Sequence, residues 1–131
     1  MLGALEQTTL SALEQTIKFA QRRHETLAGN IANMDTPGYI ARDLSVTDFQ
    51  EALAEAIESP HRRSPGMVGS ETDPMEAAQR AMENLLYHDE SKVNLERQVT
   101  EISKNQHMHN TAIALMRNQF AQLRVAISER V

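Results

Sequence analysis

The chain has 131 residues, of which 40% are hydrophobic, 24% charged and only 4% aromatic, with no cysteine and no tryptophan. This length allows one domain at most, and zero cysteine excludes a disulfide scaffold, a thiolate metal site and a thiol nucleophile. The net charge of −5 comes without a concentrated basic stripe, so we expect no nucleic-acid partner. Scarce aromatic residues beside many Leu, Ile, Ala and Met favour long helices that meet along narrow seams.

Glycine and proline divide the chain into three parts. Seven of the nine lie between positions 37 and 74, and residues 75–131 contain none. Breakers concentrated in the centre predict an all-α protein with two long terminal helices around an irregular middle. We expect a single domain with an N-terminal assembly helix over 1–36, an irregular segment over 37–74 and a C-terminal helical segment over 75–131.

Apolar residues in both terminal segments alternate at spacings of three and four. In the N-terminal segment the row is Leu10, Leu13, Ile17, Ala20, His24, Leu27, Ile31 and Met34. In the C-terminal segment it is Leu95, Val99, Ile102, Gln106, His109, Ile113, Met116, Phe120, Leu123 and Ile127. An average period near 3.5 keeps such a row on one side of a helix, where a second helix must cover it. We therefore predict an antiparallel, coiled-coil-like pair, with the last helix at about 91–129, and interpret the two rows as assembly seams.

Polar residues within these rows suggest a register for the pair. If Met34 lies near Leu95 in an antiparallel arrangement, His24 comes level with Gln106, and Ala20 with His109. A buried polar layer of this kind fixes the register of paired helices at a cost in stability. We expect His24, Gln106 and His109 to form such a layer.

Helix-starting residues predict shorter helices in and after the middle segment. A capping-box pattern that begins at Thr47 precedes an expected helix over about 48–58. Asp73 and Pro74 form a cap and a first-turn proline before a helical pattern over 75–87. Whether that helix continues into the last one is open, and the segment 60–72 shows no periodicity.

No pattern of catalytic or ligand-binding residues accompanies these helices. Gly66 and Gly69 lack the lysine of a phosphate-binding loop, and the string that begins at His24 lacks the second histidine of a zinc-protease helix. His107 and His109 are two residues apart and point in different directions on a helix. We expect no enzyme, cofactor, metal or small-molecule substrate. We also expect neither a cleaved signal peptide nor a membrane span, because the first residues lack a basic stretch and the apolar runs are short.

The most distinctive local sequence is the decapeptide NIANMDTPGY at positions 30–39. Pro37 disfavours a helical conformation at the preceding residue and Gly38 permits a positive φ, so the string ends a helix in a turn. It resembles the Asn-x-Ala-Asn-x-x-Thr-Pro-Gly-Tyr signature of the rod and hook proteins of the bacterial flagellum. The matching residues are Asn30, Ala32, Asn33, Thr36, Pro37, Gly38 and Tyr39.

Two further segments indicate which type of subunit within this family the chain resembles. Residues 41–43 and the run 93–127 are similar to the corresponding parts of B-type proximal rod subunits. The Asp-Gly-Asn turn that usually precedes the last helix of such subunits is replaced here by residues 89–92, which contain no glycine. Two alternatives remain open: another axial protein such as the C-type proximal rod subunit, and a cytoplasmic coiled-coil adapter or chaperone.

The resemblance implies a structural subunit of the proximal rod of the flagellar basal body. Such a subunit polymerises through its terminal helices, transmits torque and continues the export channel. It is exported by the flagellar type III system to the rod in the periplasmic space. The implied partners are copies of itself, the C-type proximal rod subunit, the adapter protein FliE and the export gate.

Overall fold

A computed structural model of the chain describes residues 2–58, 75–87 and 94–129. The helices are α1 (Leu2–Ala32), α2 (Val46–Glu58), α3 (Glu76–Ala81) and α4 (Leu95–Ser128), and the strands are β1 (Arg42–Leu44) and β2 (Leu85–Tyr87). The expected all-α class with two long terminal helices is confirmed, with the addition of one small antiparallel sheet.

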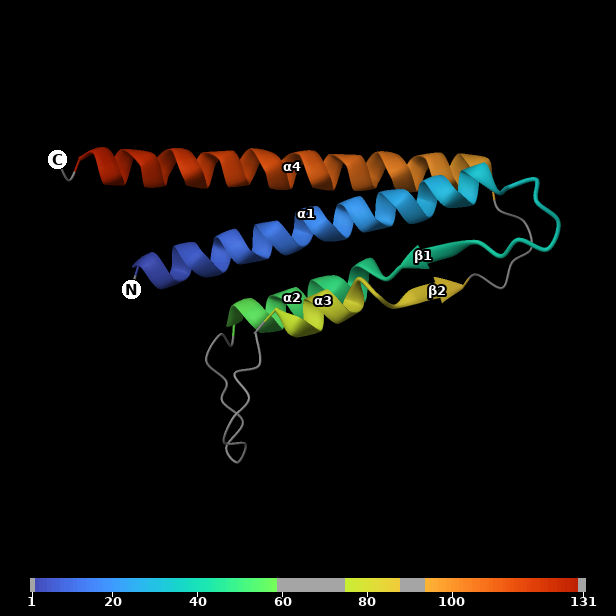
Figure 1. Cartoon of the computed structure of the whole chain (residues 1–131), viewed down its shortest axis with the longest axis horizontal. Coiled ribbons are helices and arrows are strands. Elements are labelled where there is room, and N and C mark those ends of the chain that lie inside the picture. Colours follow the sequence, from blue (N-terminus) through green and yellow to red (C-terminus); the bar gives the residue numbers. More distant parts are fainter. Residues whose placement is uncertain (1, 59–74, 88–93, 130–131) are drawn as a thin grey trace, which may run out of the picture.

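The two terminal helices run antiparallel and form one layer of the molecule (Figure 1). Asn30, near the end of α1, contacts Gln98 near the start of α4, and Ala20 contacts Asn105 farther along. These contacts place α4 within about a turn of the predicted register. The ribbons are adjacent where α1 ends and α4 begins, and they diverge toward the two termini (Figure 1).

The second layer consists of α2, α3 and the two strands, which pack mainly on α1 (Figure 1), while Met108 of α4 also contacts its core cluster. Phe19 of α1 stacks on Phe49 of α2, with ring centroids 4.1 Å apart. The same cluster contains buried Leu44, Ala78 and Ala81. Since α1 is covered on two sides, its buried face is wider than that of α4.

The helix ends differ from the sequence expectations in three places. Helix α1 ends at Ala32 rather than at residue 36, because the motif residues after it fold into a turn. Helix α2 begins earlier than expected, since the Ser45 hydroxyl accepts the Asp48 N–H at 3.1 Å and Ser45, not Thr47, is the capping residue.

The expected helix over 75–87 is short, because it ends at Ala81 and the following residues form β2. It is therefore not continuous with α4, whose first turn is capped by the Asn94 side chain. The cap at Asp73 and Pro74, the segment 60–72 and the glycine-free turn at 89–92 lie outside the described residues.

Candidate functional site

The motif at 30–39 forms a hydrogen-bonded turn at the end of α1. The Asn33 side chain donates to the Gly29 carbonyl at 2.9 Å, and the backbone N–H of Thr36 donates to the Asn33 carbonyl at 3.0 Å. Gly38 has a φ of 76°, the left-handed conformation that glycine adopts most readily. The turn reverses the chain, so that Tyr39 comes back beside α1. The other motif side chains, Ala32 and Pro37, are exposed.

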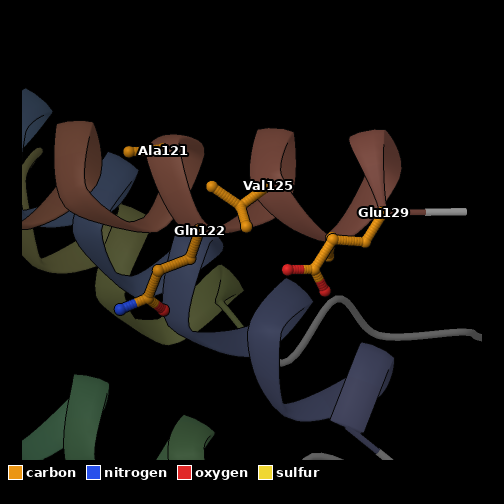
Figure 2. A pocket seen from close by; sticks show the side chains of 5 residues that line it. Ala121, Gln122, Val125 and Glu129 are labelled. Carbon is orange, nitrogen blue, oxygen red and sulfur yellow. The ribbon is translucent and has the colours of Figure 1, made fainter.

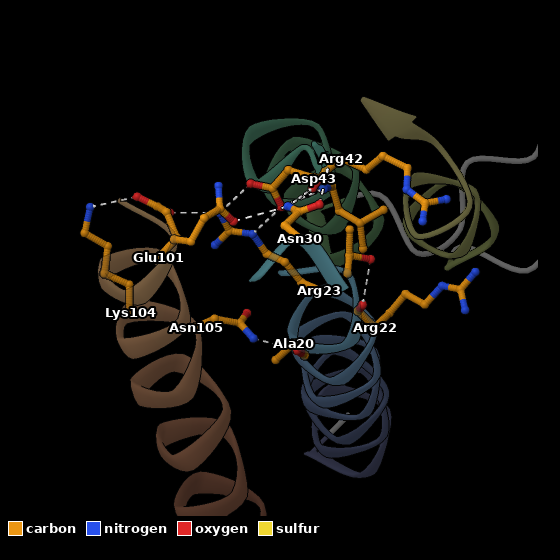
Figure 3. Close-up of polar contacts among 12 residues, drawn as sticks. Ala20, Arg22, Arg23, Asn30, Arg42, Asp43, Glu101, Lys104 and Asn105 are labelled. Atoms are coloured by element: carbon orange, nitrogen blue, oxygen red, sulfur yellow. Dashed lines mark hydrogen bonds and ion pairs between the residues drawn. The ribbon is translucent and has the colours of Figure 1, made fainter. Parts of the chain in front are cut away.

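Asn30 lies at the centre of this turn and is completely buried (Figure 3). Its Oδ1 accepts hydrogen bonds from the Tyr39 hydroxyl and the Arg42 N–H, both at 3.0 Å. Its Nδ2 donates to the Arg42 carbonyl at 2.6 Å and to Gln98 Oε1 at 3.2 Å. One side chain therefore ties together the end of α1, strand β1 and helix α4.

An ion-pair cluster that the sequence analysis missed lies one and a half to two turns before Asn30. The Arg23 guanidinium donates to both carboxylate oxygens of Asp43 at 2.9 Å and to Glu101 at 2.8 Å (Figure 3). Lys104 adds a contact to the other Glu101 oxygen at 3.3 Å. Arg23 and Asp43 are largely buried, so this bidentate pair is more strongly held than a surface salt bridge.

The pKa shifts in the cluster follow from these contacts. Burial works to lower the pKa of Arg23, but the hydrogen bonds to Asp43 and Glu101 outweigh it and raise that pKa above its ordinary value. The hydrogen bond from Arg23 lowers the pKa of Glu101, against the opposing effect of burial and with help from Lys104. Both groups are charged at neutral pH and bridge α1, β1 and α4.

On α4, the contact with α1 uses a row of residues other than the predicted one. The buried residues of α4 are Gln98, Asn105 and Ala112. Gln98 accepts from Asn30, Asn105 Nδ2 donates to the Ala20 carbonyl at 2.6 Å, and the small Ala112 permits close approach. Hydrogen bonds to α1 offset the burial of Gln98 Oε1 and Asn105 Nδ2, whereas Asn105 Oδ1 has no partner among the described residues. Apolar spacing alone does not register these bonds and so pointed to another row on α4.

The predicted layer of His24, Gln106 and His109 is wrong. His24 and Gln106 are exposed, and the Gln106 side chain donates to Asn110 of its own helix at 3.0 Å. The polar residues that cross between the helices are instead Asn30, Asn105 and the Arg23–Glu101 pair.

The predicted seam residues fall into three groups by burial and by position on the helices. Only Ala20 and Leu27 are buried. Residues at the margin of the helix contact are half-buried: Ile102, His109, Met116, Leu123 and, in the turn after α1, Met34. The remaining ones are exposed or half-buried and form what we name the outer stripe: Leu10, Leu13, Ile17, His24 and Ile31 of α1, and Leu95, Val99, Gln106, Ile113, Phe120 and Ile127 of α4.

The outer stripe is one surface made by both helices. On α4, Val99, Gln106 and Ile113 each follow a buried residue by one position. On α1, His24 and Ile31 do the same. One position turns a helix by about 100°. Because the helices are antiparallel, equal rotations in the same sense bring both rows to the same side of the pair.

The outer stripe also faces away from α2. Ile17 and His24 lie two and five residues from Phe19, which stacks on Phe49 of α2. These offsets correspond to rotations of about 160° and 140° around α1. The second layer of the fold therefore leaves this apolar surface open.

Comparison with known proteins identifies the family. A profile described as "Flagella basal body rod protein" matches residues 7–39. The flagellar basal body rod protein FlgB of Aquifex aeolicus is 30% identical over 95 residues, which cover 72% of this chain and 73% of that protein. The chain belongs to the FlgB family of flagellar basal body rod proteins. FlgB of Bacillus subtilis is 24% identical over 123 residues (92% and 93% of the two chains), and FlgB of Salmonella typhimurium 28% over 130 residues (91% of each).

Membership of the FlgB family confirms the resemblance seen in the motif and in the last helix. The chain is a structural subunit of the flagellar basal body rod. It is B-type rather than C-type, and the adapter or chaperone alternative is set aside. The family is a structural one, which agrees with the expectation that the protein is not an enzyme.

The remaining surface features of this FlgB-family chain are of minor chemical interest. An open hollow near the C-terminal end of α4 is lined by Ala121, Gln122, Val125, Ala126 and Glu129, and Figure 2 shows their side chains on that helix. Its polar side chains are the Glu129 carboxylate and the Gln122 amide, so the hollow contains neither an acid–base pair nor a nucleophile. Within residues 2–58, 75–87 and 94–129, no group of three or more histidines and carboxylates could hold a metal, and no helix is long and apolar enough to cross a bilayer.

Proposed function

We propose that this subunit polymerises into the rod by burying the outer stripe against neighbouring subunits. The observation that carries the proposal is that apolar residues from both terminal helices share one open side of the pair. Val99, Phe120 and Ile127 are 49%, 56% and 69% exposed, far more than side chains of this size in a finished core. Burying each fully contributes about 1.5–3 kcal/mol, so a few such residues per contact stabilise an assembly.

The distribution of burial along α4 supports the same proposal. Its buried residues stop at Ala112, about midway along the helix. Among the described residues beyond that point, none of the large apolar side chains of α4 is fully buried. The diverging ribbons in Figure 1 agree with this pattern. The C-terminal half of α4 thus lacks part of the packing that a helix pair needs, and neighbouring subunits would supply it.

Other components of the rod follow from the same proposal. We infer that the subunit contacts copies of itself, the C-type proximal rod subunit, the adapter protein FliE and the export gate. In this arrangement the assembled helices transmit torque and continue the export channel. The support for these partners is family membership together with an apolar surface that extends over most of both helices.

The proposal is tested by placing charge on the outer stripe. The double variant Phe120→Asp/Ile127→Asp should abolish polymerisation, measured by light scattering and electron microscopy of the purified protein, and should abolish motility in cells. A matched variant, Asn118→Asp/Gln122→Asp, places the same charge at exposed positions on the other side of α4. It should polymerise normally.

Both double variants should keep the free energy of unfolding of the monomer within about 0.5 kcal/mol, since the substituted side chains are exposed. Normal polymerisation of the Phe120/Ile127 variant, or equal loss in both variants, would refute an assembly surface at the outer stripe.

A further inference from the structure

The two edges of the small sheet differ in how their backbone groups are occupied. On β1, the N–H and C=O of Arg42 both bond to the Asn30 side chain, whose amide takes the place of a neighbouring strand. The N–H of Leu44 bonds to the Asp43 carboxylate at 2.7 Å. The outward edge of β1 is therefore closed by side chains of the same chain.

Among the described residues, no strand pairs with the outward edge of β2. Because Arg42 and Leu44 direct their N–H groups away from β2, the hydrogen-bonded pair across the sheet is Asp43 with Leu86. In an antiparallel pair the direction alternates, so the N–H and C=O of Leu85 and Tyr87 point outward. Within the part of the chain that the structure describes, these four groups have no hydrogen-bond partner.

Exposed apolar side chains accompany this edge on β2 itself. Leu86 is 48% exposed and Tyr87 is 64% exposed. Open backbone groups flanked by exposed apolar side chains are the features by which a sheet edge accepts an added strand. Main-chain hydrogen bonds then provide affinity, and the apolar side chains provide selectivity.

We propose that the outward edge of β2 is a docking site for an extended segment of a different polypeptide, with apolar side chains at alternate positions and basic residues between them. Basic residues are inferred from charge: within the described segment 75–87, Glu83 lies two residues before β2, and Arg80 is paired with Glu76 at 2.9 Å. The site is separate from the outer stripe. Figure 1 shows β2 as the strand farther from α4, so both surfaces can be occupied at once.

A second copy of the chain is a poor occupant of this edge. In a polar rod all copies share one orientation, and a contact between copies joins two different surfaces. Strand β1 cannot serve as the second surface, because Asn30 and Asp43 close its edge. Two β2 edges could pair only around a two-fold axis, which does not propagate along a rod. This exclusion rests on the proposed assembly, whereas the open edge itself does not.

The test uses the full-length chain and a labelled synthetic hexapeptide that alternates valine and lysine. Fluorescence anisotropy should show binding, and methylation of alternate peptide amides should weaken it roughly tenfold, because the bonds to the edge are lost. In the chain, Tyr87→Pro removes one outward N–H without touching the Asp43–Leu86 pair and should also weaken binding roughly tenfold. The matched variant Tyr87→Val keeps the N–H and strand preference and should bind within about twofold of the wild type.

Amide hydrogen exchange on the unsubstituted protein provides a second readout if Tyr87→Pro fails to fold. The peptide should slow exchange at Leu85 and Tyr87 and leave the already bonded Leu86 amide unchanged. Absent binding, equal binding to the proline and valine variants, or equal binding of the methylated peptide would overturn the proposal. Self-association of the wild type that Tyr87→Pro abolishes would overturn the choice of occupant. These measurements use the monomer, so they can fail while the outer-stripe experiment succeeds, and the reverse.

Discussion

Replacing Asn30 by alanine removes the side chain that joins three elements of the fold. Asn30 is completely buried and makes four hydrogen bonds, to Tyr39, Gln98 and twice to Arg42. At roughly 1 kcal/mol net for each bond, Asn30→Ala should lower the free energy of unfolding by about 4 kcal/mol. For a chain of this length that loss corresponds to a fall in Tm of roughly 15 °C.

The assay is urea unfolding followed by circular dichroism, with Asn33→Ala as the matched control. Asn33 belongs to the same motif, but its side chain donates only one short hydrogen bond, to the Gly29 carbonyl at the end of its own helix. Asn33→Ala should therefore cost about 1 kcal/mol. If the two substitutions cost the same, the bonds from Asn30 to β1 and α4 do not hold the fold together, and the reasoning is refuted.

Two further predictions concern charge and backbone conformation. Because contact with Arg23 holds the folded pKa of Glu101 below its unfolded value, the pair stabilises the protein above the unfolded pKa, and that contribution is lost as the pH falls through the folded pKa. Urea midpoints from pH 7 down to pH 3 should therefore fall less in Glu101→Gln than in the wild type, and parallel curves would contradict this. Gly38→Ala should destabilise by about 1 kcal/mol because φ is 76° there, whereas helical Gly29→Ala, which meets no atom within 4 Å, should stabilise by about 0.5–1 kcal/mol. Equal effects of the two glycine substitutions in thermal unfolding would show that conformation does not decide the outcome.

The long helices and their antiparallel pairing could be predicted, because the positions of glycine and proline and the spacing of apolar residues are local signals. The row of α4 that is buried against α1 could not be predicted. It depends on Gln98 and Asn105, whose partners lie 68 and 85 residues away in the sequence. A prediction from apolar spacing treats glutamine and asparagine as exposed, because it contains no information on a hydrogen bond to a distant residue.

The sheet and the ion-pair cluster were missed for related reasons. Strands of three residues are too short for an alternating pattern to emerge, and Leu85–Tyr87 also continued the apolar spacing of a helix. The signal for Arg23 was weak: a single arginine close to the apolar row, with its carboxylate partner 20 residues later. The motif at 30–39, by contrast, was identified from the string alone, although its bond to Gln98 was not.

The helix pair is divided into two halves that differ in the kind of force that holds them. Near the motif, Asn30, Arg23 and Asn105 cross between elements with hydrogen bonds and ion pairs, which require a defined geometry and so specify one register. Beyond Ala112, the outer-stripe residues of α4 (Ile113, Phe120 and Ile127) are apolar, and hydrophobic burial is non-directional. A non-directional surface can exchange a partner within the chain for one in a neighbouring subunit without leaving a polar group unpaired. The polar half thus fixes the shape of the monomer, and the apolar half stays available for assembly.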